Sequence, residues 1–370
     1  MILKDNFPKI AVVKIGTSSL TDKNGNIDKM SIAKIAGQVK EMADMGCATV
    51  LVSSGAIKVG MQKLGIEKRP KILPELQACC AAGQPYLMEV YNDIFDIYGL
   101  KTAQILLTAE DFRSRKRFVN MRNTFGVLLE MGCVPIVKEN DTVSIDEIKF
   151  GENDTLSALV ATGVNADLLI NLSDVNGLYT SDPSKDENAK RIPVVEKITD
   201  DIINMGGSSV SGVGSGGMAT KIKAAVIATN SGVRFVIANA KEENIILRCA
   251  KGEDVGTKFL GGENKYSGKK SWIAFAAKTK GTINVDRTAK EMLVSGKSLL
   301  SVGIESAEGL FENGDIVRVA CENKVFAKGI TYYSSKDLEK IAGAKTSEIE
   351  SILGSKPYEE IIHHNNMVIL

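Results

Sequence analysis

Apolar residues along the first 240 positions follow two alternating patterns. Short runs rich in Val, Ile and Leu predict strands that are buried on both faces. Between them, apolar residues recur every three or four positions, as they do in helices that pack on a sheet. This alternation predicts a three-layer α/β/α domain with a parallel-rich central sheet. The predicted strands are residues 9–15, 48–52, 102–108, 133–137, 166–172 and 233–238, the last of which closes the sheet.

Three longer periodic stretches predict the main helices of this domain. Residues 30–46 carry apolar side chains at helical spacing and end at a glycine, which suits the position just after a helix. Residues 73–98 read as a helix with a break at residues 83–85, where a proline removes a backbone donor. Residues 120–131 predict a third helix, and the basic residues 113–117 before it predict a solvated loop.

The pattern changes after about Gly261. Residues 262–270 are polar and lysine-rich, which is typical of a linker. Beyond them come short β-like pieces at 282–285, 316–319 and 325–327, and helix patterns at 288–295 and 335–342. We therefore expect two domains, a large α/β domain over residues 1–262 and a small, mostly β domain over residues 279–357.

Composition narrows the class of protein. The 46 Lys and Arg residues nearly cancel the 45 Asp and Glu residues, so no global field favours nucleic acid or a membrane surface. The six cysteines show no C-x-x-C spacing, and the only two histidines are adjacent, so we expect reduced thiols and no protein-built metal site. Residues 1–6 are too short and polar for a signal peptide, and no apolar run reaches membrane-spanning length. A cytoplasmic protein is expected.

Polar residues follow the predicted strands where each strand ends. In open α/β sheets these ends meet at one edge, which is the usual place for a ligand. A lysine at a buried strand end is costly unless an anion meets it, although a lysine that reaches solvent is the alternative. A tight turn alone would likewise explain the small residues after residue 52. The residues expected at this edge are Lys14, Ser54, Asp141 and Asp174.

A cluster of polar residues, 151–154, precedes the next predicted helix. Asn153 or Asp154 suits a helix cap, but capping explains only one of them. The remaining polar side chain is free to serve the same edge of the sheet.

The stretch from Ser211 to Lys221 is rich in glycine and serine and is followed by a helix pattern. Backbone amides at a helix start, together with a lysine, make a site suited to phosphate. Gly212, Gly214 and Gly217 also match G-x-G-x-x-G, but the residues before them are polar rather than a strand, which weakens a dinucleotide-binding interpretation. A flexible loop without chemical consequence is the remaining alternative.

These groups favour phosphoryl transfer. That reaction needs positive charge, a metal ion and alignment, and little covalent help from the protein. Lysines and amides supply the charge, and carboxylates hold Mg²⁺ through water. From the residues alone, a hydroxyl acceptor and a carboxylate acceptor both stay open.

Several motifs, in this order, resemble those of the amino acid kinase family. They are residues 12–18, 53–57, 140–141, 151–154, 177–183 and 214–221. The tail from residue 281 through 317 resembles a PUA domain. The combination is most similar to those family members that phosphorylate the γ-carboxylate of L-glutamate with MgATP, the first step of proline synthesis.

The resemblance implies a role for each motif. Lys14 and Lys221 would hold the phosphates and Asp154 would orient both lysines. Ser54, Asp141 and Asn153 would bind glutamate. ATP would be held by Lys14, Ser173, Asp174, Ser215, Gly216, Gly217, Met218, Ala219, Thr220 and Lys221. Ser173 and Ala219 replace a threonine and a serine that are common in relatives, both mild changes.

The resemblance also implies partners. They are ATP and Mg²⁺, proline as an inhibitor acting near residues 113–150, a homo-oligomer and glutamyl phosphate reductase. PUA domains elsewhere bind RNA, but the charge balance disfavours RNA as a partner here, because 11 Lys and Arg residues balance 11 Asp and Glu residues over 279–357. An NAD-type oxidoreductase is the other rival, and the missing strand and internal histidines disfavour it.

Overall fold

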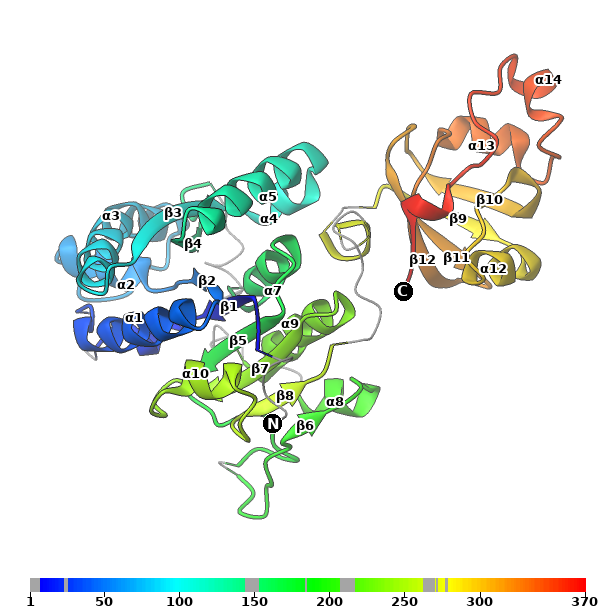
Figure 1. The fold of residues 1–370 in the computed structure, drawn as a ribbon. Coiled ribbons are helices and arrows are strands. Elements are labelled where there is room, and N and C mark those ends of the chain that lie inside the picture. Colours follow the sequence, from blue (N-terminus) through cyan, green and yellow to red (C-terminus); the bar gives the residue numbers. More distant parts are fainter. Residues whose placement is uncertain are drawn as a thin grey trace. The chain divides into compact units, whose positions relative to one another are not determined.

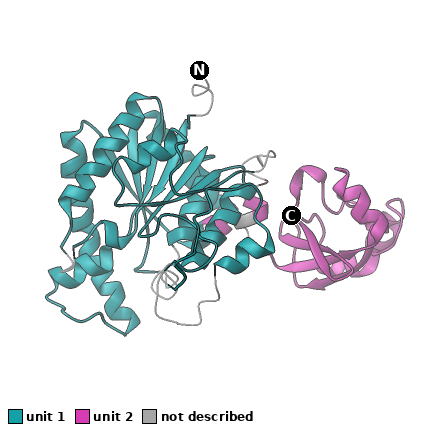
Figure 2. Cartoon of the chain, turned by 90° about the horizontal axis from the view of Figure 1, so that it is seen from below, with its two compact units in different colours: residues 1–111, 116–265 teal, residues 112–115, 266–370 magenta. Residues whose placement is uncertain are grey.

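The structure is a computed structural model that describes residues 7–22, 26–143, 153–183, 185–206, 217–261, 270, 272–276 and 279–370. The chain forms two compact units, coloured separately in Figure 2. One comprises residues 1–111 and 116–265, and the other comprises residues 112–115 and 266–370. In the described residues, no helix is both long enough and apolar enough to cross a bilayer.

An eight-stranded sheet forms the centre of the first unit, in the order β3-β4-β2-β1-β5-β7-β8-β6. Its strands pair in parallel except β7 with β8, so the predicted parallel-rich sheet is confirmed. The prediction that residues 233–238 close the sheet is wrong, because β8 and β6 extend it beyond β7. The strands are β1 Ile10–Lys14, β2 Ala48–Val52, β3 Lys101–Leu107, β4 Cys133–Glu139, β5 Leu168–Ser173, β6 Val194–Val195, β7 Arg234–Asn239 and β8 Thr257–Phe259.

Helices cover both faces of this sheet, as Figure 1 shows. On one face α1, α3 and α10 pack against the strands in a single buried core. On the other face α7 and α9 pack against each other and against β1, β5 and β7. The three-layer α/β/α architecture is thus confirmed. The helices are α1 Lys29–Asp44, α2 Ala56–Lys63, α3 Leu73–Ile97, α4 Ala109–Arg113, α5 Arg115–Glu130, α7 Asn153–Gly163, α8 Asp200–Met205, α9 Met218–Asn230 and α10 Ile245–Ala250.

Strand alternation decides which side chains reach α7. Ala11, Val13 and Ile15 belong to the core under α1 and α3. Because successive side chains point to opposite faces of a strand, Val12 and Lys14 face the α7 side. The last residue of β1 therefore points toward the helix that begins at Asn153.

Helices α2 and α3 cross at two glycines. A Cβ atom on Gly60 would lie 1.7 Å from the Cys79 carbonyl oxygen, and one on Gly83 would lie 2.1 Å from the Ala56 carbonyl oxygen. This close approach fixes α2, and with it the turn that carries Ser54.

Two local predictions for this region are wrong. Helix α3 runs through Pro85 without the predicted break, since buried residues on both sides of the proline pack on the same core. The basic residues 113–117 are mostly exposed, as predicted, but they fall mostly in α4 and α5 rather than in a loop.

The second unit is built on a five-stranded sheet in the order β10-β9-β11-β12-β13, with its own buried core. The predicted pieces are present, and β10 and β13 are additional. A capping box at Ser334 and Asp337 starts α13. The elements are a helical turn Trp272–Ala276, β9 Gly281–Val285, α12 Arg287–Val294, β10 Ile304–Gly309, β11 Ile316–Cys321, β12 Lys324–Ile330, α13 Ser335–Ile341, α14 Ile349–Leu353 and β13 Met367–Ile369.

Candidate functional site

Four parallel strands deliver the predicted polar residues to one edge of the large sheet. Lys14 ends β1, and Ser54 follows β2 by two residues. Asp141 follows β4, and Ser173 ends β5. Helix α7 begins at the same edge with Asn153 and Asp154. The predicted convergence on the carboxyl ends of the strands is therefore found.

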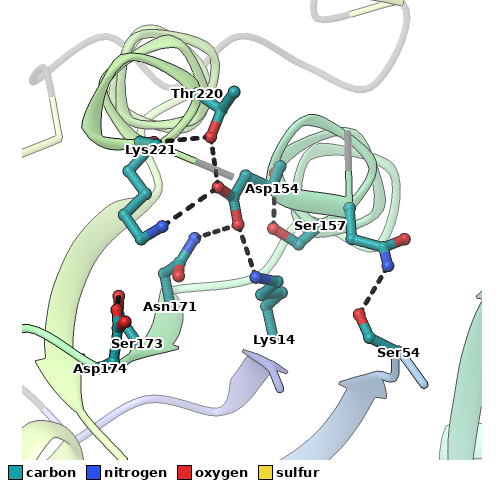
Figure 3. A network of polar contacts seen from close by, with 11 residues as sticks. Lys14, Ser54, Asp154, Ser157, Asn171, Ser173, Asp174, Thr220 and Lys221 are labelled. Carbon is teal, nitrogen blue, oxygen red and sulfur yellow. Dashed lines mark hydrogen bonds and ion pairs between the residues drawn. The ribbon is translucent and has the colours of Figure 1, made fainter. Parts of the chain in front are cut away.

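The centre of this edge is the fully buried carboxylate of Asp154. Its Oδ1 lies 2.8 Å from the Lys14 ammonium, and its Oδ2 lies 3.6 Å from the Lys221 ammonium. The Asn171 amide donates to Oδ1 at 2.9 Å, and the Thr220 hydroxyl donates to Oδ2 at 2.7 Å. Figure 3 shows the four donors around the carboxylate. Two lysines from distant parts of the chain are thus held beside one acid.

The charges of this cluster stabilise one another. Burial alone would raise the pKa of Asp154, but Lys14 and then Lys221 outweigh burial, and the pKa falls to about 2. Burial lowers the pKa of Lys221, and the neighbouring Asp154 carboxylate opposes that shift. Asp154 is therefore ionised throughout the neutral range.

Beside this cluster lie two further polar pairs. The Asn153 amide donates to the Ser54 hydroxyl at 2.6 Å, and both residues are buried. The Lys138 ammonium donates to Asp141 Oδ2 at 2.6 Å, and both side chains are only 3% exposed. Asp141 Oδ1 is buried and has no hydrogen-bond partner among the described residues. A buried carboxylate oxygen in this state is available to a ligand donor.

A cavity of about 600 Å³ opens over these groups. Six of the predicted residues line it, and Asp154 and Asp141 pair with lysines of the lining. Three cations without a predicted role, Lys58, Arg69 and Lys138, also line it. Positive charge therefore predominates on the cavity wall, which suits an anionic ligand. The predicted residues in the lining are Lys14, Ser54, Asn153, Ser173, Asp174 and Lys221.

The glycine-rich stretch is described only from Gly217 onward. Gly217 precedes α9 as its N-cap, and Met218, Ala219 and Thr220 form the first turn of that helix, ahead of Lys221. Ser215 and Gly216, and also Gly212 and Gly214, lie outside the described residues. Among the described residues, the last element before the stretch is helix α8 rather than a strand, which disfavours a dinucleotide fingerprint.

The sequence patterns assign no role to four residues of this site. Asn171 falls within a predicted apolar strand, Lys138 directly follows the predicted strand 133–137, and Lys58 directly follows the motif at 53–57. Arg69, in the connection between α2 and α3, carried no motif. For Asn171 a signal was present, since an amide inside the run Leu168–Leu172 is unusual unless it is bonded.

Comparisons with known proteins agree with this geometry. Residues 9–239 match the amino acid kinase family, and residues 281–353 match the PUA domain. The chain is 49% identical to a glutamate 5-kinase of Caldanaerobacter subterraneus subsp. tengcongensis, over 97% of both chains. It is 46% identical to a glutamate 5-kinase of Citrifermentans bemidjiense over 98% of both chains. A glutamate 5-kinase of Methanosarcina barkeri is 45% identical, over 97% of this chain and 96% of that protein.

Similarity at this level spans both units and all the motifs around Asp154. The chain belongs to the amino acid kinase family and, within it, to the glutamate 5-kinases that carry a C-terminal PUA domain.

Proposed function

We propose that this chain transfers the terminal phosphoryl group of ATP to the γ-carboxylate of L-glutamate and forms L-glutamyl 5-phosphate for proline biosynthesis. The observation that carries the proposal is the buried Asp154 carboxylate, which holds two lysines at the edge of a cationic cavity. Full-length similarity to glutamate 5-kinases supports the choice of acceptor.

A carboxylate acceptor fits the groups that are present. Such an acceptor is already ionised at neutral pH, so no general base has to remove a proton from it. No histidine lines the cavity in the described part of the chain. In the reaction, a glutamate oxygen forms a bond to phosphorus while the bond from phosphorus to the bridging oxygen breaks, and ADP leaves. The chain has only to align the two substrates and offset negative charge.

The two lysines supply the charge in this proposal. Lys14 ends a central strand and Lys221 lies in the second turn of α9, so neither depends on a surface loop for its position. Asp154 keeps both ammoniums in place and reduces their mutual repulsion. A preorganised arrangement of this kind stabilises charge in a transition state without reorganisation at the moment of reaction.

Glutamate would bind on the side of the cavity formed by Ser54 and Asn153. Their hydrogen bond joins the turn after β2 to the start of α7 and so fixes this wall. Asp141, with one oxygen held by Lys138 and the other without a described partner, suits the ammonium group of an amino acid.

ATP would bind on the opposite side, formed by Ser173, Asp174 and the first turn of α9. Amides at a helix start favour phosphate. Ser215 and Gly216, proposed for the same role, lie outside the described residues. Mg²⁺ fits as an ion that arrives with the nucleotide, because the described residues contain no cluster of three acidic, His or Cys ligands. When bound, Mg²⁺ neutralises charge on the phosphates, and Asp174 would hold it through water.

Inhibition by proline is part of the proposal. Of the predicted region, residues 113–143 comprise mainly α5 and β4, and residues 144–150 lie outside the described residues. Proline, a smaller amino acid with the same charged groups at its α-carbon, would compete for the Asp141 side of the cavity. Glutamate saturation curves at several proline concentrations test this; an unchanged apparent KM for glutamate would contradict it.

The test of the proposed function uses the reactivity of an acyl phosphate. The full chain is incubated with glutamate, MgATP and hydroxylamine, and the hydroxamate is measured by its ferric complex. We expect hydroxamate with glutamate and none when ATP is omitted. ATP turnover without hydroxamate would show that the acceptor is not a carboxylate.

A further inference from the structure

Asn171 is a polar residue in a strand that needs none for folding. It lies in the middle of β5 between Ile170 and Leu172, and its side chain is completely buried. Its Oδ1 has no hydrogen-bond partner among the described residues. An unpartnered buried acceptor costs roughly 1–3 kcal/mol. Leucine at position 171 would therefore stabilise this strand at least as well as asparagine does. The amide therefore calls for an explanation other than packing.

The amide nitrogen of Asn171 has a specific partner. It donates to Asp154 Oδ1 at 2.9 Å. The parallel register of β1 and β5 places Lys14 opposite Asn171, so the ammonium and the amide reach the same carboxylate oxygen from neighbouring strands. The sheet itself therefore sets the distance between these two donors.

The donors around Asp154 are arranged evenly over its two oxygens. Oδ1 has the Lys14 ammonium and the Asn171 amide, and Oδ2 has the Lys221 ammonium and the Thr220 hydroxyl. Each oxygen thus has one charged and one neutral donor (Figure 3). Both ammoniums are drawn toward any bound phosphate by their charge, whereas Asn171 and Thr220 carry no charge.

We propose that Asn171 is a positioning residue for phosphoryl transfer, whose amide fixes the Asp154 carboxylate so that Lys14 and Lys221 keep their places when phosphate binds. Held only by lysines, the carboxylate would rotate about its side-chain bond and follow them. With Asn171 on one oxygen and Thr220 on the other, it stays in one orientation. This inference rests on the proposed function.

The test replaces Asn171 with leucine, which is close in size and removes the amide. We expect kcat to fall roughly 10- to 100-fold with KM for ATP and glutamate within about threefold, because misplaced groups cost rate rather than binding. The melting temperature should change little, since removal of the unpartnered oxygen offsets loss of the hydrogen bond to Asp154. Asn171→Ala provides a second variant without the amide and should show the same loss of kcat if the leucine variant does not fold.

Thr49→Val is the matched control. Thr49 lies buried in β2, and its hydroxyl also has no described partner, but it pairs with Ala11, three residues before Lys14 and away from the edge that carries Asp154. The kcat of Thr49→Val should stay within about twofold of that of the unsubstituted chain. A folded Asn171 variant with kcat within twofold of the unsubstituted chain would overturn the inference. Absence of hydroxamate from the unsubstituted chain would instead overturn the proposed function, so the two failures are distinguishable.

Discussion

Replacing Lys221 with methionine removes one of the two ammoniums beside Asp154 while keeping the length of the side chain. The Lys221 side chain is 7% exposed, and its ammonium lies 3.6 Å from the carboxylate. At that distance, with an effective dielectric constant of 20, the pair interacts by roughly 5 kcal/mol before desolvation is subtracted. Its ammonium also faces the cavity in which phosphate would bind.

The expected cost to catalysis exceeds the cost to folding. Loss of one preorganised donor typically lowers kcat by about 10²–10³-fold, or roughly 2.7–4 kcal/mol. Asp154 keeps Lys14, Asn171 and Thr220 as donors, and removal of Lys221 also removes its repulsion of Lys14. We therefore expect the free energy of unfolding to fall by less than the ~3 kcal/mol at the lower end of what removal of one partner of a buried ion pair costs.

The assay is steady-state hydroxamate formation, with thermal unfolding followed by circular dichroism. Lys223→Met is the matched control, because Lys223 lies on the same helix, is exposed and does not line the cavity. Lys221→Arg should recover only part of the rate, since a planar guanidinium replaces a compact ammonium. A folded Lys221→Met variant with kcat near that of the control would refute the catalytic role of this lysine.

Three further outcomes follow from burial, backbone contact and ligand chemistry. Burial lowers the pKa of Lys221, so this side chain loses its charge at a lower pH than an ordinary lysine does. We therefore expect kcat/KM for ATP to decline with rising pH below pH 10.5, and we expect Lys221→Arg to shift this decline to higher pH. Gly60→Ala forces backbone apart and should lower the melting temperature by roughly 3–10 °C, whereas Gly126→Ala, with open space around it, should not. EDTA should abolish turnover and excess Mg²⁺ should restore it, whereas stoichiometric zinc in the purified protein would contradict the inferred ligand chemistry.

Much of the fold could be predicted from the sequence because periodicity and strand ends are local signals. The apolar runs located the central strands, and the polar residues at or after their ends located Lys14, Ser54 and Asp141 at one edge. The distal strands β6 and β8 were missed because they have two and three residues, too few for a pattern. Helix α3 continues through Pro85 because tertiary packing outweighs the local preference for a break.

The details of the site depend on contacts that no local pattern contains. Asn171 meets Asp154 only because β1 and β5 are neighbours in the sheet, although they are more than 150 residues apart in the chain. Lys138 and Asp141 are only three residues apart, so their ion pair is a local contact. Only the burial of both side chains, which the sequence does not show, distinguishes this pair from one at the solvated surface. The resemblance to a kinase family located Lys14, Lys221 and Asp154, but it did not predict the contact of Asn171 with Asp154 or that of Lys138 with Asp141.

ATP turnover against a panel of acceptors tests the central claim most directly. The full chain is assayed for ADP release with MgATP and, in turn, L-glutamate, L-aspartate, N-acetyl-L-glutamate and UMP. We expect glutamate to give the highest kcat/KM by at least about tenfold, which corresponds to roughly 1.4 kcal/mol of transition-state discrimination. Equal or greater kcat/KM with any other acceptor would contradict the account.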